Sequence, residues 1–149
     1  MVVICDTSSL IRLYKTQTLY LLKSLFQKVY LPLAVYQECQ GELKEAIDSC
    51  QFIICQPQAI IFTQFGAGER AALNLALETP YSFVLVDDKK AINAASRVSI
   101  KTITTLQCWV LAKQQKHLLA VKPYIYQLQE MGEGISEREI ADILALANE

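Results

Sequence analysis

Five short apolar runs, most of them rich in β-branched residues, alternate along the chain with longer stretches in which apolar residues recur at helical spacing. The runs read "VVIC", "KVYLP", "FIIC", "SFVLV" and "IKTI". Short apolar runs bounded by turn residues are typical of buried strands, and strands that alternate with helices form parallel sheets. The pattern predicts an α/β fold in which a central parallel sheet is covered by helices on both faces.

Residues that start or stop helices divide the connecting stretches. "DTSS" after the first run indicates a helix N-terminus, and Pro32 suits the first turn of a helix that Gly41 stops. Thr104 or Thr105 can cap a helix that runs through Lys113, and "SERE" has the spacing of a capping box. The other helices are expected over residues 18–26, 42–50, 67–79, 88–97 and 121–131.

The chain is large enough for a hydrophobic core: it has 149 residues, of which 52% are hydrophobic and 19% charged. No repeat, low-complexity stretch or linker divides it, so we expect a single domain over residues 1–149. The formal net charge of −1 argues against a broad surface for polyanions. A local basic patch remains compatible with this charge, and its candidates are Arg12, Lys15, Lys89, Lys90 and Arg97.

The cysteines and the N-terminus indicate a cytoplasmic protein. The five cysteines are odd in number and contain no CxxC pair, which favours small buried hydrophobic side chains over disulfides. The N-terminal stretch is too short and, at Asp6, too polar for a signal peptide. No apolar run is long enough to span a bilayer, so we expect no membrane association.

Aspartates follow two of the predicted strands directly. Asp6 follows "VVIC", and the pair Asp87 and Asp88 follows "SFVLV". Because ligand sites in open parallel sheets gather at the carboxyl ends of strands, these acids would face one crevice if their strands are neighbours. A single aspartate can equally be a helix cap, and for Asp6 the two roles weigh about the same, since Thr7 and Ser8 could cap instead. In the Asp87–Asp88 pair, helix capping explains only one of the two aspartates, and the other requires a different role.

Two glutamates lie on helix faces that should be buried. Glu69 shares a face with Leu73 and Ala76, in the first turn of its helix, and Glu38 shares a face with Val35. The simpler interpretation of Glu69 is a favourable charge at a helix N-terminus, and that of Glu38 is a surface position. Five other glutamates are expected to be ordinary solvated acids: Glu42, Glu45, Glu130, Glu133 and Glu137.

Carboxylates brought together in this way repel one another, and a hard divalent cation such as Mg²⁺ or Mn²⁺ relieves the repulsion. Such an ion can activate water and brace a phosphodiester. Zinc fits poorly, because the only histidine is His117 and no Cys/His ligand spacing exists. The lack of a histidine partner also argues against Ser-His or Cys-His chemistry, and "GAGE" is too short for a P-loop.

Four blocks of the sequence, in order and spacing, resemble the PIN-domain ribonucleases. The blocks are "VVICDTSSLIRL", "LPLAVYQEC", "GAGERAALNLALE" and "VLVDDKKAINAA". The chain looks most like the compact, uncharacterised PIN-like branch associated with toxin–antitoxin operons, and its C-terminal "GISEREIADILALA" resembles the tail of that branch. The resemblance spans almost the full chain and implies a three-layer α/β/α sandwich.

The resemblance also implies a set of site residues and a reaction. The family's acidic positions map onto Asp6, Glu38, Glu69 and the Asp87–Asp88 pair, with Ser8 matching a hydroxyl residue that assists the first aspartate. Glu69 stands where many toxins of the family have aspartate. We expect Asp87 to be the ligand and Asp88 the cap, and we expect the metal ligands to include Asp6, Glu69 and Asp87.

These features predict a Mg²⁺- or Mn²⁺-dependent endoribonuclease, the toxin of a two-protein module. Arg12, Lys89 and Lys90 would contact the RNA backbone. By resemblance we expect a homodimer that an antitoxin protein silences. The alternative is a non-catalytic PIN-like module that binds RNA or a partner protein, and the short chain disfavours a third hypothesis, a 5′ nuclease acting on DNA.

Overall fold

A five-stranded parallel sheet forms the centre of the computed structural model, which describes residues 1–149. The strand order is β3-β2-β1-β4-β5, so β1 lies in the middle with β2 and β4 as its neighbours. All pairs are parallel, as predicted. The strands are β1 (Val2–Cys5), β2 (Lys28–Pro32), β3 (Ile53–Cys55), β4 (Ser82–Leu85) and β5 (Lys101–Ile103).

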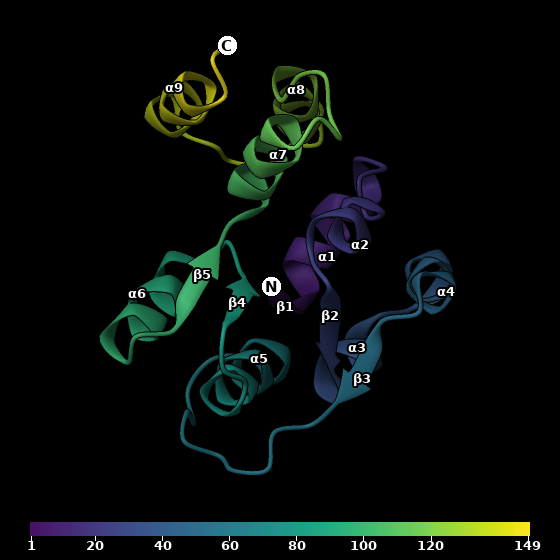
Figure 1. The fold of residues 1–149 in the computed structure, drawn as a ribbon, viewed down its shortest axis with the longest axis vertical. Helices are drawn as coiled ribbons and strands as arrows, with labels where there is room; N and C mark the ends of the chain where they lie inside the picture. The colour runs from purple at the N-terminus through teal and green to yellow at the C-terminus, as the bar shows by residue number, and fades with distance from the viewer.

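Nine helices cover the two faces of the sheet (Figure 1). The predicted three-layer α/β/α arrangement is therefore confirmed. The first six helices are α1 (Thr7–Lys15), α2 (Leu21–Leu25), α3 (Leu33–Glu38), α4 (Gly41–Cys50), α5 (Ala67–Glu78) and α6 (Lys89–Arg97). The C-terminal three are α7 (Thr105–Gln114), α8 (Lys122–Glu130) and α9 (Glu137–Leu146).

Two hydrophobic clusters lie on opposite faces of the sheet, because successive side chains of a strand point to opposite sides. In β1, Val3 and Cys5 belong to the larger cluster, which α1, α2 and α7–α9 complete. Ile4 of the same strand belongs to the smaller cluster, which α5 and α6 complete. The five cysteines are all free, as the sequence predicts.

Two expected helix boundaries are wrong. The helix expected over 18–26 shortens to α2, because the buried hydroxyl of Thr18 instead bonds the carbonyl of Leu13 and the indole of Trp109. Gly41 does not stop α3, which already ends at Glu38; it is the first residue of α4, with φ of 59°. Glycine reaches this left-handed conformation at little cost.

The helix caps fit the sequence well. Thr104, rather than Thr105, caps α7 and forms a capping box with Gln107. Ser136 caps α9 by accepting a hydrogen bond from the backbone amide of Glu139. Such caps satisfy backbone amides that have no partner inside the helix. None of the helices has the length and apolar character needed to cross a membrane.

The strand order determines where the acidic residues meet. In the register of β1 and β4, Cys5 lies opposite Leu85. Asp6 follows Cys5, and Asp87 comes two residues after Leu85, so both leave the sheet at the same edge. These are the carboxyl ends of neighbouring parallel strands, where α/β proteins place ligand sites.

Candidate active site

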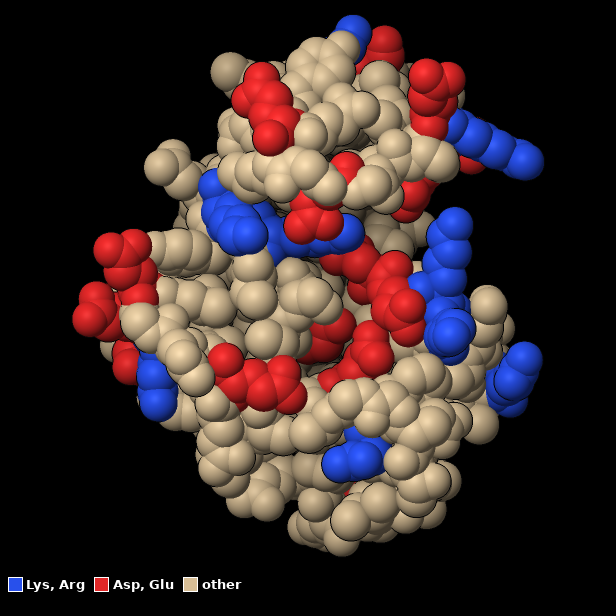
Figure 2. Space-filling model, turned by 180° about the vertical axis from the view of Figure 1, so that it is seen from behind, with Lys and Arg blue, Asp and Glu red and all other residues tan.

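A polar cavity of about 190 Å³ lies at the carboxyl end of β1, and none of its lining residues is hydrophobic. Figure 2 shows acidic side chains gathered around a hollow on one face of the molecule. The cavity brings together three of the predicted acids from three separate elements. Its lining residues are Asp6, Thr7, Ser8, Glu38, Gly66, Gly68 and Glu69.

Asp6 combines the two roles that the sequence left open. Its side chain caps α1, with Oδ1 accepting from the backbone amide of Ser9 at 3.0 Å, and it also lines the cavity. The hydroxyl of Ser8 donates to Oδ2 at 3.3 Å. Burial raises the pKa of Asp6 to about 6; the hydrogen bonds from Ser9 and Ser8 lower it, and the charge of Asp87 raises it. The carboxylate is thus held in place but is costly to ionise.

Glu38 reaches the cavity from the last turn of α3. Its Oε2 accepts a hydrogen bond of 2.7 Å from the hydroxyl of Thr7, which orients the exposed carboxylate. Gly68 of α5 allows this approach: a Cβ atom there would lie 2.8 Å from Oε1 of Glu38 and 3.0 Å from Cγ2 of Val35. Only a residue without a side chain at position 68 leaves room for Glu38 where it lies.

Glu69 lies in the first turn of α5 and is partly buried. Burial, followed by the charges of Asp88, Asp6 and Glu38, raises the pKa of Glu69 to about 7. The negative charges of these three neighbours therefore all oppose the ionisation of Glu69. The face of α5 predicted for Glu69 therefore agrees with its position.

Asp88 caps α6, as predicted, because its Oδ2 accepts from the backbone amide of Ala91 at 3.1 Å. The doublet is therefore divided between two tasks. Asp88 is exposed and contributes its charge to the field at Glu69. Asp87 is more buried and turns to a different set of partners.

Both oxygens of the Asp87 carboxylate have donors from α1 or α7. Thr105 donates to it twice, from its amide to Oδ1 at 2.8 Å and from its hydroxyl to Oδ2 at 2.7 Å. The hydroxyl of Ser9 donates to Oδ2 at 3.2 Å, and Nη1 of Arg12 lies 3.1 Å from the same oxygen. Asp87 is not among the residues that line the acidic cavity.

The three residues expected to contact RNA differ in whether an acidic partner already holds the side chain. Lys89 and Lys90 are exposed in the first turn of α6, directly after Asp88. Arg12 instead pairs with Asp87 and, through Nη2 at 2.9 Å, with Oε2 of Glu133.

The expectation of an ordinary solvated Glu133 is wrong, because its contact with Arg12 joins positions 121 residues apart, a separation that no local pattern reveals. Thr7, Ser9 and Thr105 were also missed, since each acts through a tertiary contact.

The side chains as they lie form no group of three or more acidic, histidine or cysteine residues able to hold a metal ion. The oxygen donors of the cavity suit a hard divalent cation by their chemistry. Their positions do not assemble the expected ligand set of Asp6, Glu69 and Asp87, because the oxygens of Asp87 bind Arg12, Ser9 and Thr105. The residues present therefore do not fit a ready-made metal site.

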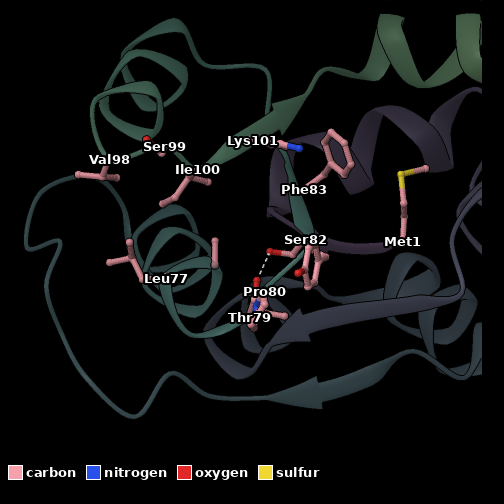
Figure 3. A pocket seen from close by; sticks show the side chains of 12 residues that line it. Met1, Leu77, Thr79, Pro80, Ser82, Phe83, Val98, Ser99, Ile100 and Lys101 are labelled. Carbon is pink, nitrogen blue, oxygen red and sulfur yellow. Dashed lines mark hydrogen bonds between the residues drawn. The ribbon is translucent and has the colours of Figure 1, made fainter.

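A second cavity, of about 530 Å³, lies at the opposite, amino-terminal end of β4 and β5 (Figure 3). Its walls are largely apolar, with Leu77, Tyr81 and Val98 exposed around it. The ammonium group of Lys101 lies 6.0 Å from the centre of the Phe83 ring. This cavity contains no carboxylate, so it lacks the chemistry expected of the acidic edge.

A parallel α/β/α sandwich with carboxylates at the carboxyl ends of its central strands defines a class of acidic-site α/β domains. Within that class, a family model described as a PIN domain matches residues 2–149, and the chain belongs to the PIN-domain family. No curated protein and no solved structure matches the chain. PIN domains are generally nucleases that use divalent metals, which gives this fold a nuclease-like character.

Proposed function

We propose that this protein is an endoribonuclease that uses Mg²⁺ or Mn²⁺ to cleave RNA phosphodiester bonds. The observation that carries the proposal is the convergence of Asp6, Glu38 and Glu69 on one polar cavity of a PIN domain. Their positions are 32 and 31 residues apart in sequence, so the fold rather than local structure gathers them. Burial opposes the ionisation of Asp6 and Glu69, and neighbouring charges add to this at Glu69, which supports a role in binding a cation.

In this proposal Asp6, Glu38 and Glu69 would hold the cation only after closing around it, because as they lie they form no group able to hold a metal ion. A divalent ion supplies a lowered pKa of bound water and compensation for the charge of the phosphodiester. The chain's own contribution is orientation: Ser9 and Ser8 hold the carboxylate of Asp6, and Thr7 holds that of Glu38. Such positioning reduces the reorganisation that the reaction requires.

Lys89 and Lys90 are the proposed contacts to the RNA backbone. Both are exposed in the first turn of α6. Contacts of this kind set the register of the RNA without reading its sequence. Ser8, exposed at the rim of the cavity, is a further candidate for contacting substrate.

The resemblance to toxin-associated PIN domains extends the proposal to cellular context. We infer a cytoplasmic toxin that forms a homodimer and is silenced by an antitoxin protein. Light scattering at micromolar concentration tests the dimer, and a monomeric mass would remove that part of the proposal. A small neighbouring reading frame that encodes a DNA-binding partner would support the toxin assignment.

RNA cleavage by purified protein tests the proposed activity. Labelled single-stranded RNA is incubated with the wild type, with Asp6→Asn and with Asp142→Asn, in Mn²⁺ and in EDTA. Asp142 is an exposed acid of α9 outside the acidic cavity, so it is the matched control for loss of one negative charge. We expect cleavage by the wild type and Asp142→Asn only, and only with Mn²⁺. Equal cleavage by Asp6→Asn, or none by any variant, contradicts the proposal.

A second candidate function, a non-catalytic PIN-like module that binds RNA or a protein, is favoured by one observation. The acids form no ready-made metal group, and Asp87 already has a cation in Arg12. RNA binding that EDTA leaves unchanged, together with no heat of Mn²⁺ binding, would support this alternative. Tight Mn²⁺ binding that Asp6→Asn abolishes would exclude it.

A further inference from the structure

Arg12 joins three parts of the molecule through its guanidinium group. Nη1 lies 3.1 Å from Oδ2 of Asp87, which follows β4, and Nη2 lies 2.9 Å from Oε2 of Glu133, in the loop between α8 and α9. Arg12 itself belongs to α1, the helix that Asp6 caps. A positive charge is therefore built into the edge of the sheet at which the acids meet.

The three side chains are only partly exposed, with relative accessibilities of 22% for Arg12, 13% for Asp87 and 30% for Glu133. Partial burial lowers the pKa of Arg12, but the charges of Asp87 and Glu133 and their hydrogen bonds more than offset this, and the net pKa is raised. Partly buried ion pairs are also screened less by salt than surface pairs. Arg12 is thus a permanent cation at this position.

The contacts of Asp87 are concentrated on one of its two carboxylate oxygens. Oδ2 has three donors, namely Arg12, the Thr105 hydroxyl and the Ser9 hydroxyl. A carboxylate oxygen has about two lone-pair sites, so this oxygen is already saturated. Arg12 therefore supplies the positive charge at this oxygen of Asp87.

Asp87 and Asp6 lie on either side of Ser9. The Ser9 amide donates to Asp6 and its hydroxyl to Asp87, and the charge of Asp87 raises the pKa of Asp6. Arg12 pairs with Asp87, whose charge acts on Asp6, and this pairing reduces the negative potential available to a cation in the acidic cavity. Arg12 is not among the residues that line the cavity, so its charge acts there through Asp87.

We infer that Arg12 is a resident counter-ion that keeps Asp87 out of the metal-binding set and lowers the affinity of the acidic cavity for divalent cations. Arg12 is a positioning residue in this role, because it acts through Asp87. The inference rests on the proposed function, in which the cavity binds Mg²⁺ or Mn²⁺. Glu133 holds the second arm of the guanidinium and so ties the α8–α9 loop to the same contact.

Isothermal calorimetry with Mn²⁺ on the full chain tests this inference. The variants are Arg12→Gln and Arg12→Met, which both remove the charge, Arg12→Lys, which keeps it, and Lys113→Gln. Lys113 pairs with Glu149 at the far end of α7 from Thr105, so its replacement loosens the C-terminal segment without touching Asp87. Circular dichroism identifies which of the two neutral variants folds, and that variant is compared with the wild type.

We expect the neutral variant to bind Mn²⁺ about tenfold more tightly than the wild type, because one opposing charge is removed and Asp87 is released. Arg12→Lys is expected to stay near the wild-type affinity, as is Lys113→Gln. Equal or weaker binding by the neutral variant, or no binding by any protein, overturns the inference. A similar gain in Lys113→Gln overturns it as well, since loosening alone would then explain the change.

The inference and the proposed function fail in distinguishable ways. If the wild type cleaves RNA with Mn²⁺ and Asp6→Asn does not, but the neutral variant of Arg12 binds Mn²⁺ no more tightly, the function stands and the counter-ion role falls. If the neutral variant gains Mn²⁺ affinity but no protein cleaves RNA, the counter-ion role stands and the nuclease proposal falls.

Discussion

Thr105 holds the carboxylate of Asp87 with both of its donors, its amide at 2.8 Å and its hydroxyl at 2.7 Å. Thr105 is the first residue of α7 and is fully buried, so this pair fastens the loop after β4 to the start of α7. A carboxylate at a helix N-terminus is also favoured by the helix dipole. Asp87 therefore links the sheet to the helices that follow it.

The two aspartates of the doublet are expected to differ in their contribution to stability. Asp87→Asn replaces an ion-paired acceptor by an amide that presents a donor to other donors, so we expect a loss of about 2–4 kcal/mol in the free energy of unfolding. Asp88→Asn should cost less than about 1 kcal/mol, because asparagine caps helices as well as aspartate does. Urea denaturation of both variants measures the difference, and equal losses would contradict it.

Gly68→Ala is expected to displace Glu38 and weaken Mn²⁺ binding. The new methyl group would lie 2.8 Å from Oε1 of Glu38, and the flexible carboxylate is the group that can move. Stability should change little, because the higher helix propensity of alanine, about 1 kcal/mol, offsets the crowding against Val35. Calorimetry with Mn²⁺ measures the affinity.

Gly66→Ala is the matched control for that experiment, since a Cβ atom at position 66 would meet nothing within 4 Å. Gly66 also lines the acidic cavity and precedes α5. It should therefore keep the wild-type Mn²⁺ affinity. A comparable loss in both glycine variants would show that Glu38 is not the cause.

Glu69→Gln is expected to make the metal-free protein more stable at pH 8 and to leave it nearly unchanged at pH 4. In the folded state the pKa of Glu69 is raised from 4.5 to about 7, so folding favours the protonated form. The stability from this preference is complete below about pH 4.5 and is lost as the pH rises through 7. Thermal unfolding of Glu69→Gln and the wild type in EDTA, from pH 4 to pH 8, measures the difference in stability.

The matched control here is Glu130→Gln, which removes the charge of an exposed acid in α8. Its melting temperature should follow the wild type at every pH. For a chain of this size, each kcal/mol gained by Glu69→Gln raises the melting temperature by about 2–4 °C. A Glu69→Gln curve that runs parallel to the wild type would show that the carboxylate is not destabilised by its surroundings.

Thr18→Val is expected to destabilise the protein by about 1–3 kcal/mol, although it preserves the side-chain shape. The indole Nε1 of Trp109 donates to the hydroxyl of Thr18 at 3.0 Å, and both residues are fully buried. Valine leaves that N–H group without a partner. In a Trp109→Phe background the same substitution should cost less, and urea denaturation of the four proteins measures the coupling. Additive losses would contradict it.

Most of the fold was predictable because its signals are local. Each of the five apolar runs forms a strand, and the caps at Thr104 and Ser136 act within three residues of themselves. The errors fall where a distant contact outweighs the local preference. Thr18 lies outside α2 because its hydroxyl binds Trp109, 91 positions away.

The candidate site was predictable in part for the same reason. Asp6, Glu38 and Glu69 could be selected because each is a carboxylate at a strand end or on a buried helix face, and the structure places all three at one cavity. The sequence could not show whether Asp87 is available to a metal ion or Arg12 to RNA. Their partners come from α7 and from the α8–α9 loop, and no spacing in the sequence relates those segments to β4.

By itself, the sequence determined which segments become strands and helices, the class of fold, and which carboxylates stand at their ends, because hydrophobic periodicity and capping act over a few residues. The tertiary structure alone decided how those charges are paired. In the folded chain Asp87 pairs with Arg12 and accepts hydrogen bonds from Ser9 and Thr105, whereas Asp6, Glu38 and Glu69 line the cavity. Electrostatic and hydrogen-bond partners depend on distances of a few ångströms between segments remote in sequence, and only the packed sheet and helices set those distances.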